Sequence, residues 1–310
     1  MDCNKIDSLG PMCKYLKGGL WLFCGLLFSI FVLAQDPFQL AIVAFQQRNF
    51  GKVLSLLSSV STEQKHNAHF HGLRAMALTE LKRYNEALEA NREAQKLSPQ
   101  NPNYFYNAGL IHVKREDFIE AERVFRDAID RFPTSSAPYE GLGDALFEQN
   151  RLKEAEKYLR KAIELDPDSG IAYVLLAKLF YAIGDERLLG WSASKAVQLV
   201  PQQYLACYYY GKWLLEYRQN VGLAKQYIQR SVGLSPGFAE GLKALARILS
   251  RQGLWKQAAQ VYEKAISAEP EEAQNYYLLA IVYRRLGQNK KAHRAIYEYQ
   301  KRTKHQNESQ

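Results

Sequence analysis

The sequence contains few of the residues that mark disulfide-bonded, metal-binding or redox proteins. Of its 310 residues only four are cysteine, and three of these, Cys3, Cys13 and Cys24, lie close to the N-terminus. Cys207 is the only cysteine beyond them, so loss of the N-terminal segment would leave no pair for an internal disulfide. A Gly-rich phosphate loop, a zinc-protease helix and a closely spaced cysteine pair are also missing. Nothing here supports an enzyme, and we expect no cofactor and no metal site.

Long stretches of alternating apolar and polar residues, which indicate β-strands, are also missing. Apolar residues make up 47% of the chain and charged residues 24%, a balance typical of ordered proteins. Ala, Leu, Glu, Lys, Arg and Tyr dominate the body of the chain, and most of them favour helices. The composition therefore predicts an all-α fold.

The strongest apolar run lies near the N-terminus. Lys14 and Lys17 precede an uncharged stretch containing LWLFCGLLFSIFVL, and Val32-Leu33-Ala34 ends it with a site that signal peptidase could read. We predict a signal peptide over residues 1–34, with Met12 as an alternative start, and an exported protein that is periplasmic, in the cell envelope or extracellular. The alternative is an uncleaved membrane anchor through residues 18–34, a length at the lower limit for spanning a bilayer.

Six of the ten prolines recur at a nearly fixed interval, namely Pro99, Pro133, Pro167, Pro201, Pro236 and Pro270. Successive members are about 34 residues apart, and only the interval before Pro236 is longer, by a single residue. Because proline cannot continue a helix, each one marks a place where a helix ends and the chain turns. A fixed period of about 34 residues indicates an array of two-helix repeats.

Small residues fall into columns at the same period. The first column is Ala75, Gly109, Gly143, Ala177, Gly211, Ala246 and Ala280. The second is Ala87, Ala121, Ala155, Ala224, Ala258 and Ala292, with Leu189 as the exception, and the third is Ala94, Ala128, Ala162, Ala196, Ser231 and Ala265. Small residues on both helices of a pair let the helix axes approach closely. From residue 68 to about 303 this pattern resembles the tetratricopeptide repeat family.

The resemblance implies a right-handed α-solenoid, a superhelix of stacked helix-turn-helix units, with at least 14 helices and no sheet. A degenerate helical repeat is predicted first, because FQLAIVAFQQRNFGKVLSLL has helix-turn-helix spacing but lacks the small columns. The predicted boundaries are 35–67 for this degenerate unit, then 68–101, 102–135, 136–169, 170–203, 204–238, 239–272 and 273–306 for the tetratricopeptide repeats, the last with a basic tail.

The first helix of each unit should line a concave wall that can hold a peptide or protein. Repeat alignment gives as candidate groove residues Tyr106, Leu110, Lys114, Asp144, Phe147, Lys178, Tyr181, Tyr208, Lys212, Lys243, Arg247, Arg251, Tyr277 and Arg284. Their mixture of aromatic and basic side chains is typical of a protein-binding surface. Some relatives clamp chaperone tails with Lys and Asn at set groove positions. Here Tyr106, Leu110 and Gly141 stand there, so that ligand is not expected.

The sequence therefore predicts a non-enzymatic scaffold that binds an unknown protein or peptide. Lys243, Arg247 and Arg251 follow one another at intervals of four and share a helix face, which favours an acidic segment in the partner. The alternative is an envelope- or membrane-associated protein that binds an anionic surface. It would use the stretch 284–304, which contains eight basic residues and a single acidic residue, Glu298. We expect no nucleic-acid partner.

Overall fold

The computed structural model describes residues 36–308, which form 17 helices and contain no strand. The predicted all-α solenoid is confirmed, and the 17 helices agree with the expectation of at least 14. The predicted signal peptide and membrane anchor lie outside the described residues. Within residues 36–308, no helix is both long enough and apolar enough to cross a membrane.

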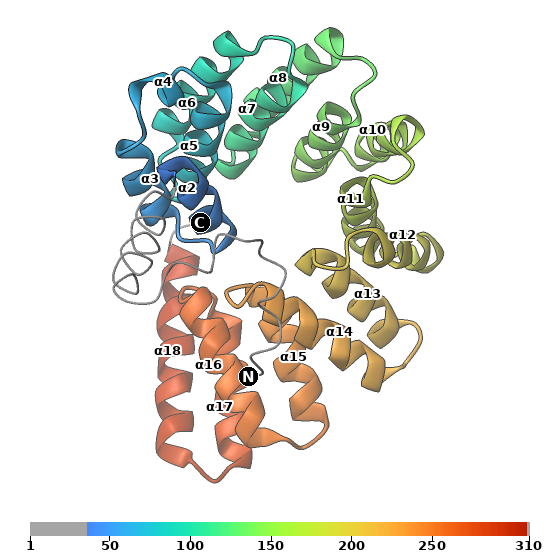
Figure 1. The fold of residues 1–310 in the computed structure, drawn as a ribbon. Helices are drawn as coiled ribbons and strands as arrows, with labels where there is room; N and C mark the ends of the chain where they lie inside the picture. The colour runs from blue at the N-terminus through green and yellow to red at the C-terminus, as the bar shows by residue number, and fades with distance from the viewer. Residues whose placement is uncertain (1–35, 309–310) are drawn as a thin grey trace, which may run out of the picture. The chain divides into compact units, whose positions relative to one another are not determined.

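The helices, which Figure 1 draws with their labels, form two compact units, one ending at Asp117 and the other beginning at Phe118. The first unit contains α2 (Pro37–Gln46), α3 (Phe50–Ser58), α4 (Thr62–Lys65), α5 (Ala68–Glu80), α6 (Tyr84–Leu97) and α7 (Pro102–Lys114). The second contains α8 (Phe118–Arg131), α9 (Ser136–Glu148), α10 (Leu152–Leu165), α11 (Gly170–Ile183), α12 (Glu186–Leu199), α13 (Tyr204–Glu216), α14 (Val221–Leu234), α15 (Ala239–Arg251), α16 (Trp255–Ala268), α17 (Ala273–Arg285) and α18 (Asn289–Glu308). The division falls between α7 and α8, inside the predicted repeat 102–135.

Each repeat proline follows the end of a second helix. The second helices from α6 to α16 all end two residues before their proline. The residue two positions after the proline is the N-cap of the next helix, and its side chain often accepts a hydrogen bond from the first turn. The Ser169 hydroxyl accepts from the Ala172 N–H at 3.1 Å, and the Asn101 side-chain oxygen accepts from the Asn103 N–H at 3.0 Å. These caps satisfy backbone donors that a helix leaves free at its N-terminus.

The turn inside each helix pair contains one residue in the left-handed conformation. These residues recur at the repeat period and are Arg48, Lys82, Glu116, Asn150, Gly184, Gln219, Gly253 and Gly287. Left-handed backbone ends a helix and reverses the chain within a few residues. Arg48 precedes Lys82 by one full repeat period, so the turn between α2 and α3 follows the same spacing as the later ones.

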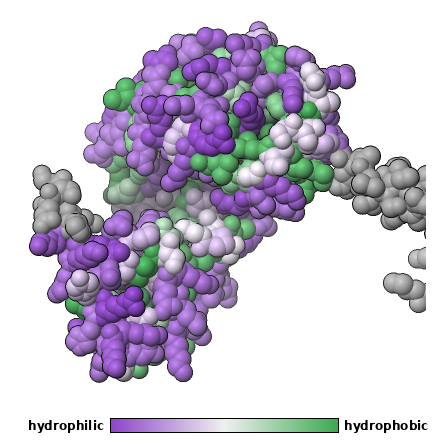
Figure 2. All heavy atoms as spheres, turned by 90° about the vertical axis from the view of Figure 1, so that its left-hand side faces the viewer, coloured by the Kyte–Doolittle hydropathy of each residue, from purple (hydrophilic) through white to green (hydrophobic). Residues whose placement is uncertain are grey.

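The small columns allow close packing within the helix pairs of the second unit. A Cβ atom added to Gly143 on α9 would lie 2.6 Å from Cδ2 of Leu159 on α10. A Cβ atom on Gly211 of α13 would likewise lie 2.7 Å from Cγ1 of Ile228 on α14. Apolar side chains fill the spaces between the helices, and hydrophilic residues dominate the face shown in Figure 2.

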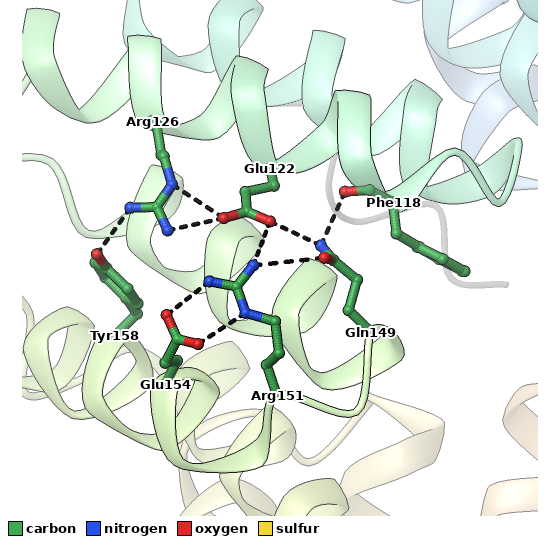
Figure 3. A network of polar contacts seen from close by, with 7 residues as sticks. All are labelled: Phe118, Glu122, Arg126, Gln149, Arg151, Glu154 and Tyr158. Atoms are coloured by element: carbon green, nitrogen blue, oxygen red, sulfur yellow. Dashed lines mark hydrogen bonds and ion pairs between the residues drawn. The ribbon is translucent and has the colours of Figure 1, made fainter.

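A polar network joins α8, the turn after α9 and α10 (Figure 3). Glu122 on α8 accepts hydrogen bonds from Arg126, from the Gln149 amide at 3.0 Å and from Arg151 at 2.7 Å. Arg151 also makes two bonds of 2.7 Å to Glu154. Burial acts to raise the pKa of Glu122, but these hydrogen bonds and charges outweigh it, so the pKa lies below its ordinary value. The network holds α8 against the pair formed by α9 and α10.

Candidate functional site

A groove of about 600 Å³ runs along the first helices of the second unit. Its walls come from α11, α13 and α15 and from the start of α17. Six of the fourteen predicted groove residues line it together, namely Tyr181, Tyr208, Lys212, Lys243, Arg247 and Arg251. The repeat period brings them together because residues at equal positions in successive units lie side by side in a stack.

Tyr181 and Tyr208 form an aromatic wall of this groove, and further rings pack against them from within the unit. The Tyr208 ring lies 5.0 Å from that of Phe238 and 5.2 Å from that of Tyr209, and Tyr209 lies 5.8 Å from Tyr181. Tyr208 is only 7% exposed, so most of its ring is packed within the unit. Burial raises the pKa of Tyr208 and of Tyr209, so both hydroxyls stay protonated at neutral pH. The wall therefore offers mainly the half-buried ring of Tyr181, together with a small part of the uncharged Tyr208 side chain.

Two lysines of the groove are already paired with carboxylates. Lys212 forms an ion pair with Glu216 and lies 5.0 Å from the centre of the Tyr181 ring. Burial acts to lower the pKa of Lys212, but Glu216 and Tyr181 outweigh it and the pKa is raised. Lys243 Nζ lies 3.6 Å from a Glu269 oxygen and 3.8 Å from a Glu240 oxygen. A ligand would meet little unbalanced charge at either lysine.

Arg247 and Arg251 differ from these lysines. Both are exposed, and among residues 36–308 no carboxylate is recorded within 4.0 Å of either guanidinium. Arg247 approaches the hydroxyl of buried Tyr262. Burial raises the pKa of that hydroxyl, and Arg247 acts in the opposite direction. The uncompensated positive charge of the groove is therefore concentrated on one face of α15.

Three other predicted groove residues, Asp144 and Phe147 on α9 and Lys178 on α11, form a closed cluster instead. Lys178 Nζ lies 2.8 Å from Asp144, 2.5 Å from Glu148 and 4.5 Å from the centre of the Phe147 ring. Burial alone would lower the pKa of Lys178, but the two carboxylates raise it above its usual range. Because Lys178 covers the face of Phe147, this ring is less available as an apolar anchor than its sequence position suggests.

The remaining predicted residues are not among those that line this groove. Tyr277 and Arg284 are exposed on α17, and the Tyr277 ring lies 5.4 Å from that of Tyr299 on α18. Tyr106, Leu110 and Lys114 belong to α7 in the first unit, where Lys114 Nζ lies 3.6 Å from Glu80. Their contribution to binding stays a prediction.

Several groove residues were not predicted, although the repeat spacing contained a signal for some of them. Leu215 and Glu216 line the groove on α13, and Leu215 follows Tyr181 by one full repeat period. Ala244 and Ile248 on α15 could not be found in this way. Repeat alignment selected Lys243 and Arg247, and Ala244 and Ile248 are the residues that directly follow them. No group of three or more His, Cys, Asp or Glu within the described part of the chain could hold a metal ion.

The sequence comparisons agree with this architecture. Models of the tetratricopeptide repeat match residues 76–115, 106–170, 141–185, 242–275 and 261–294. The chain therefore contains tetratricopeptide repeats, a fold that serves as a scaffold for protein interaction.

The chain also matches parts of longer curated relatives. The TPR repeat-containing protein MJ1428 of Methanocaldococcus jannaschii is 25% identical over 70% of this chain and 47% of its own length. The E3 ubiquitin-protein ligase CHIP of Arabidopsis thaliana is 28% identical over 37% of this chain and 42% of its own. The chain thus spans less than half the length of these curated relatives.

Two solved structures show a similar fold. One is the APC/C hetero-tetramer Cut9-Hcn1, with a TM-score of 0.68 and 15% identity over 84% of this chain and 52% of the other. The second is Pseudomonas aeruginosa pilF, with a TM-score of 0.57 and 18% identity over 64% of this chain and 95% of the other.

Proposed function

We propose that this chain is a non-enzymatic scaffold that holds an acidic segment of a partner protein in the groove of the second unit. The observation that carries the proposal is the pair of exposed arginines on α15, Arg247 and Arg251, beside an aromatic wall. Carboxylates of the partner would meet these guanidinium groups, because the groove lysines are already neutralised by Glu216, Glu240 and Glu269.

The aromatic wall and the two arginines would contribute differently. Exposed charges chiefly accelerate association and set orientation, whereas packed aromatic surface slows dissociation. Tyr181 offers the more accessible ring of the wall, since Tyr208 is largely buried. A partner segment with an apolar residue next to acidic ones fits this arrangement.

The C-terminal basic stretch gives less support to binding of an anionic surface. Arg302 pairs with Glu298 and lies 4.2 Å from the centre of the Tyr276 ring. Lys291 lies over Tyr283, and Arg285 lies over Trp255. These contacts within the chain explain part of the basic character of 284–304.

We further propose that the scaffold acts after export to the periplasm or cell envelope. The support is the sequence of residues 1–34, with its basic flank, apolar run and small-residue site. Cleavage predicts a mature N-terminus at Gln35. Mass spectrometry that finds residues 18–34 in the mature protein would establish the anchored form instead.

Reversal of the two arginines tests the groove. With the partner captured from the native envelope fraction, the double variant Arg247→Glu/Arg251→Glu should associate about tenfold more slowly at low salt. Its association rate should also depend less on ionic strength. Arg230→Glu/Lys264→Glu, on α14 and α16, makes the same change in net charge at exposed positions outside the groove and should leave the rate nearly unchanged. Equal association rates for the groove variant and the parent would overturn the proposal.

A further inference from the structure

The second helix of the first helix pair is unusually short. α3 has 9 residues, whereas α6, α8, α10, α12, α14 and α16 each have 14. The five missing residues correspond to about 7.5 Å of helix, at 1.5 Å per residue. α3 ends at Ser58, and the chain continues into the four-residue helix α4. Part of α5 that a full-length second helix could cover is therefore left open.

A pocket of about 400 Å³ occupies this place. Leu54, Leu57 and Ser58 of α3 form one side of it, and Phe70, His71, Arg74 and Leu78 of α5 form the other, with Lys65 and Arg83 at the rim. Leu57, Phe70 and Leu78 are 2%, 6% and 1% exposed, so the apolar part of the lining belongs to the packed core. All of these residues lie in the first unit.

Arg74 breaks the repeat pattern at this pocket. It stands one residue before the first small column, where the later units have Ala108, Leu142, Leu176, Tyr210, Leu245 and Leu279. Leu142 and Leu176 are fully buried, whereas Arg74 is exposed. A charged residue occupies this otherwise uncharged position in the one unit where the preceding second helix is short. The short helix and the arginine are independent features that coincide at the same pocket.

The pocket is lined by cations and by no carboxylate. Arg74 has no acid recorded within 4.0 Å among the described residues, although Glu86 is near enough to feel its charge. Arg83 is paired through two of its nitrogens with Glu86, at 2.7 and 2.6 Å. Lys65 Nζ lies 3.4 Å from the Ser58 carbonyl oxygen. Arg74 and Lys65 therefore contribute most of the uncompensated charge.

His71 adds a neutral polar group. Its Nε2 lies 2.9 Å from the Lys65 carbonyl oxygen, which can only accept, so Nε2 donates and Nδ1 carries the lone pair. Burial and the charge of Arg74 lower the pKa of His71, against the opposing effects of the Lys65 carbonyl and Glu93. The cationic character of the pocket thus does not depend on this histidine.

We propose that this pocket is a second binding site, specific for a short acidic, leucine-rich segment of a partner protein. Leucine side chains of the segment would fill the space left by the short α3 and contact Leu57, Phe70 and Leu78. Its carboxylates would pair with Arg74 and Lys65. Charge complementarity selects this occupant over the chain's own N-terminal segment, because residues 1–34 contain three lysines and only two acids.

A synthetic peptide tests the site directly. Fluorescence anisotropy of labelled DELLDELL with the purified full chain should show saturable binding. The charge-reversed peptide KRLLKRLL and the peptide DESSDESS, which lacks the leucines, should bind at least about tenfold more weakly. If KRLLKRLL bound as tightly as DELLDELL, the binding would be non-specific apolar contact and the proposal would be overturned. The proposal would also be overturned if DELLDELL showed no binding up to millimolar concentration.

Two variants locate the peptide on the molecule. Arg74→Glu removes the central cation, and Ser58→Trp fills the pocket from the end of α3, and each should weaken binding by about tenfold or more. Because both positions are exposed, thermal melting should confirm that the variants stay folded. Arg92→Glu, at an exposed position of α6 outside the pocket, is the matched charge control and should bind normally.

The groove of the second unit could also bind an acidic peptide, so it needs its own control. Arg247→Glu/Arg251→Glu should leave the Arg74-dependent binding intact. If the double variant lost all binding while Arg74→Glu bound as well as the parent, the peptide would bind in the second unit and the proposed pocket would be refuted. Arg74-dependent binding to phosphatidylglycerol vesicles without binding to DELLDELL would identify a lipid site and refute the peptide site.

Discussion

Replacing Gly143 by leucine should force apart the helix pair formed by α9 and α10. The Cβ atom alone would lie 2.6 Å from both Cγ and Cδ2 of Leu159 and 3.4 Å from the Ala155 carbonyl oxygen. Leu159 is 1% exposed, so it has no solvent-filled space into which to move. The rest of the new side chain needs further space in a core packed at ordinary protein density.

The expected destabilisation is at the upper end of the range for overpacking, about 3 kcal/mol. For a unit of roughly 200 residues, each kcal/mol shifts Tm by about 2–4 °C, so Tm should fall by about 6–12 °C. Gly233→Leu is the matched control, because Gly233 lies on α14 with no atom within 4 Å of its Cβ position. That variant should melt at or slightly above the parent, since leucine favours helix over glycine by up to about 1 kcal/mol.

Differential scanning calorimetry of the parent and both variants provides the measurement. In hydrogen exchange of Gly143→Leu, the backbone amides of α9 and α10 should lose protection before those of the other helices. If Gly143→Leu melts within a degree of the parent, the first small column is not a close helix contact. The packing account of the repeat period would then be wrong.

Two further stability predictions follow from the turns and the polar network. Glu122→Gln should destabilise the second unit by about 1–3 kcal/mol, because Arg126 and Arg151 lose a partly buried charged partner. The folded-state pKa of Glu122 is lowered, so its contribution is present above the unfolded pKa and disappears as pH falls through the folded value. Urea titrations at a series of pH values should therefore show the stability gap between parent and variant closing below about pH 4; a constant gap down to pH 2 would contradict the network. Gly184→Ala should cost about 1 kcal/mol through backbone strain alone, since Gly184 has a φ of 76° and no atom near its Cβ position. An unchanged midpoint for this variant in chemical denaturation would show that the turn relaxes without cost.

The repeat array could be predicted because its signal is redundant. The prolines and the small columns give the same period independently, so the exception at Leu189 does not obscure it. The N-terminal pair α2 and α3 was also expected from helix-turn-helix spacing. The left-handed turn residues were not predicted, because only Gly184, Gly253 and Gly287 among the eight are glycine. At the other turns the helix pairing determines the backbone conformation, and residues such as Lys82 adopt it at some cost.

The position of the candidate site could be predicted from the sequence, but which of its basic side chains are paired with carboxylates could not. Repeat alignment placed Lys178 and Asp144 at equal positions of successive units, which makes them neighbours. That Lys178 also reaches Glu148 and covers Phe147 depends on side-chain conformations that the spacing does not define. Arg247 and Arg251 have no carboxylate partner among the described residues, and only the structure distinguishes them from the neutralised lysines.

The central claim, that the partner lies in the groove of the second unit, is tested most directly by site-specific photo-crosslinking. Leu215 lines the groove on α13, whereas Gln229 is exposed on α14 outside the groove. A benzophenone amino acid would be introduced at one or the other of these positions. We expect irradiation of the protein in its native envelope fraction to crosslink one discrete partner from position 215 and not from position 229. That crosslink should weaken when Arg247 and Arg251 are changed to glutamate. Crosslinking of the same partner from position 229 but not from position 215 would contradict the account.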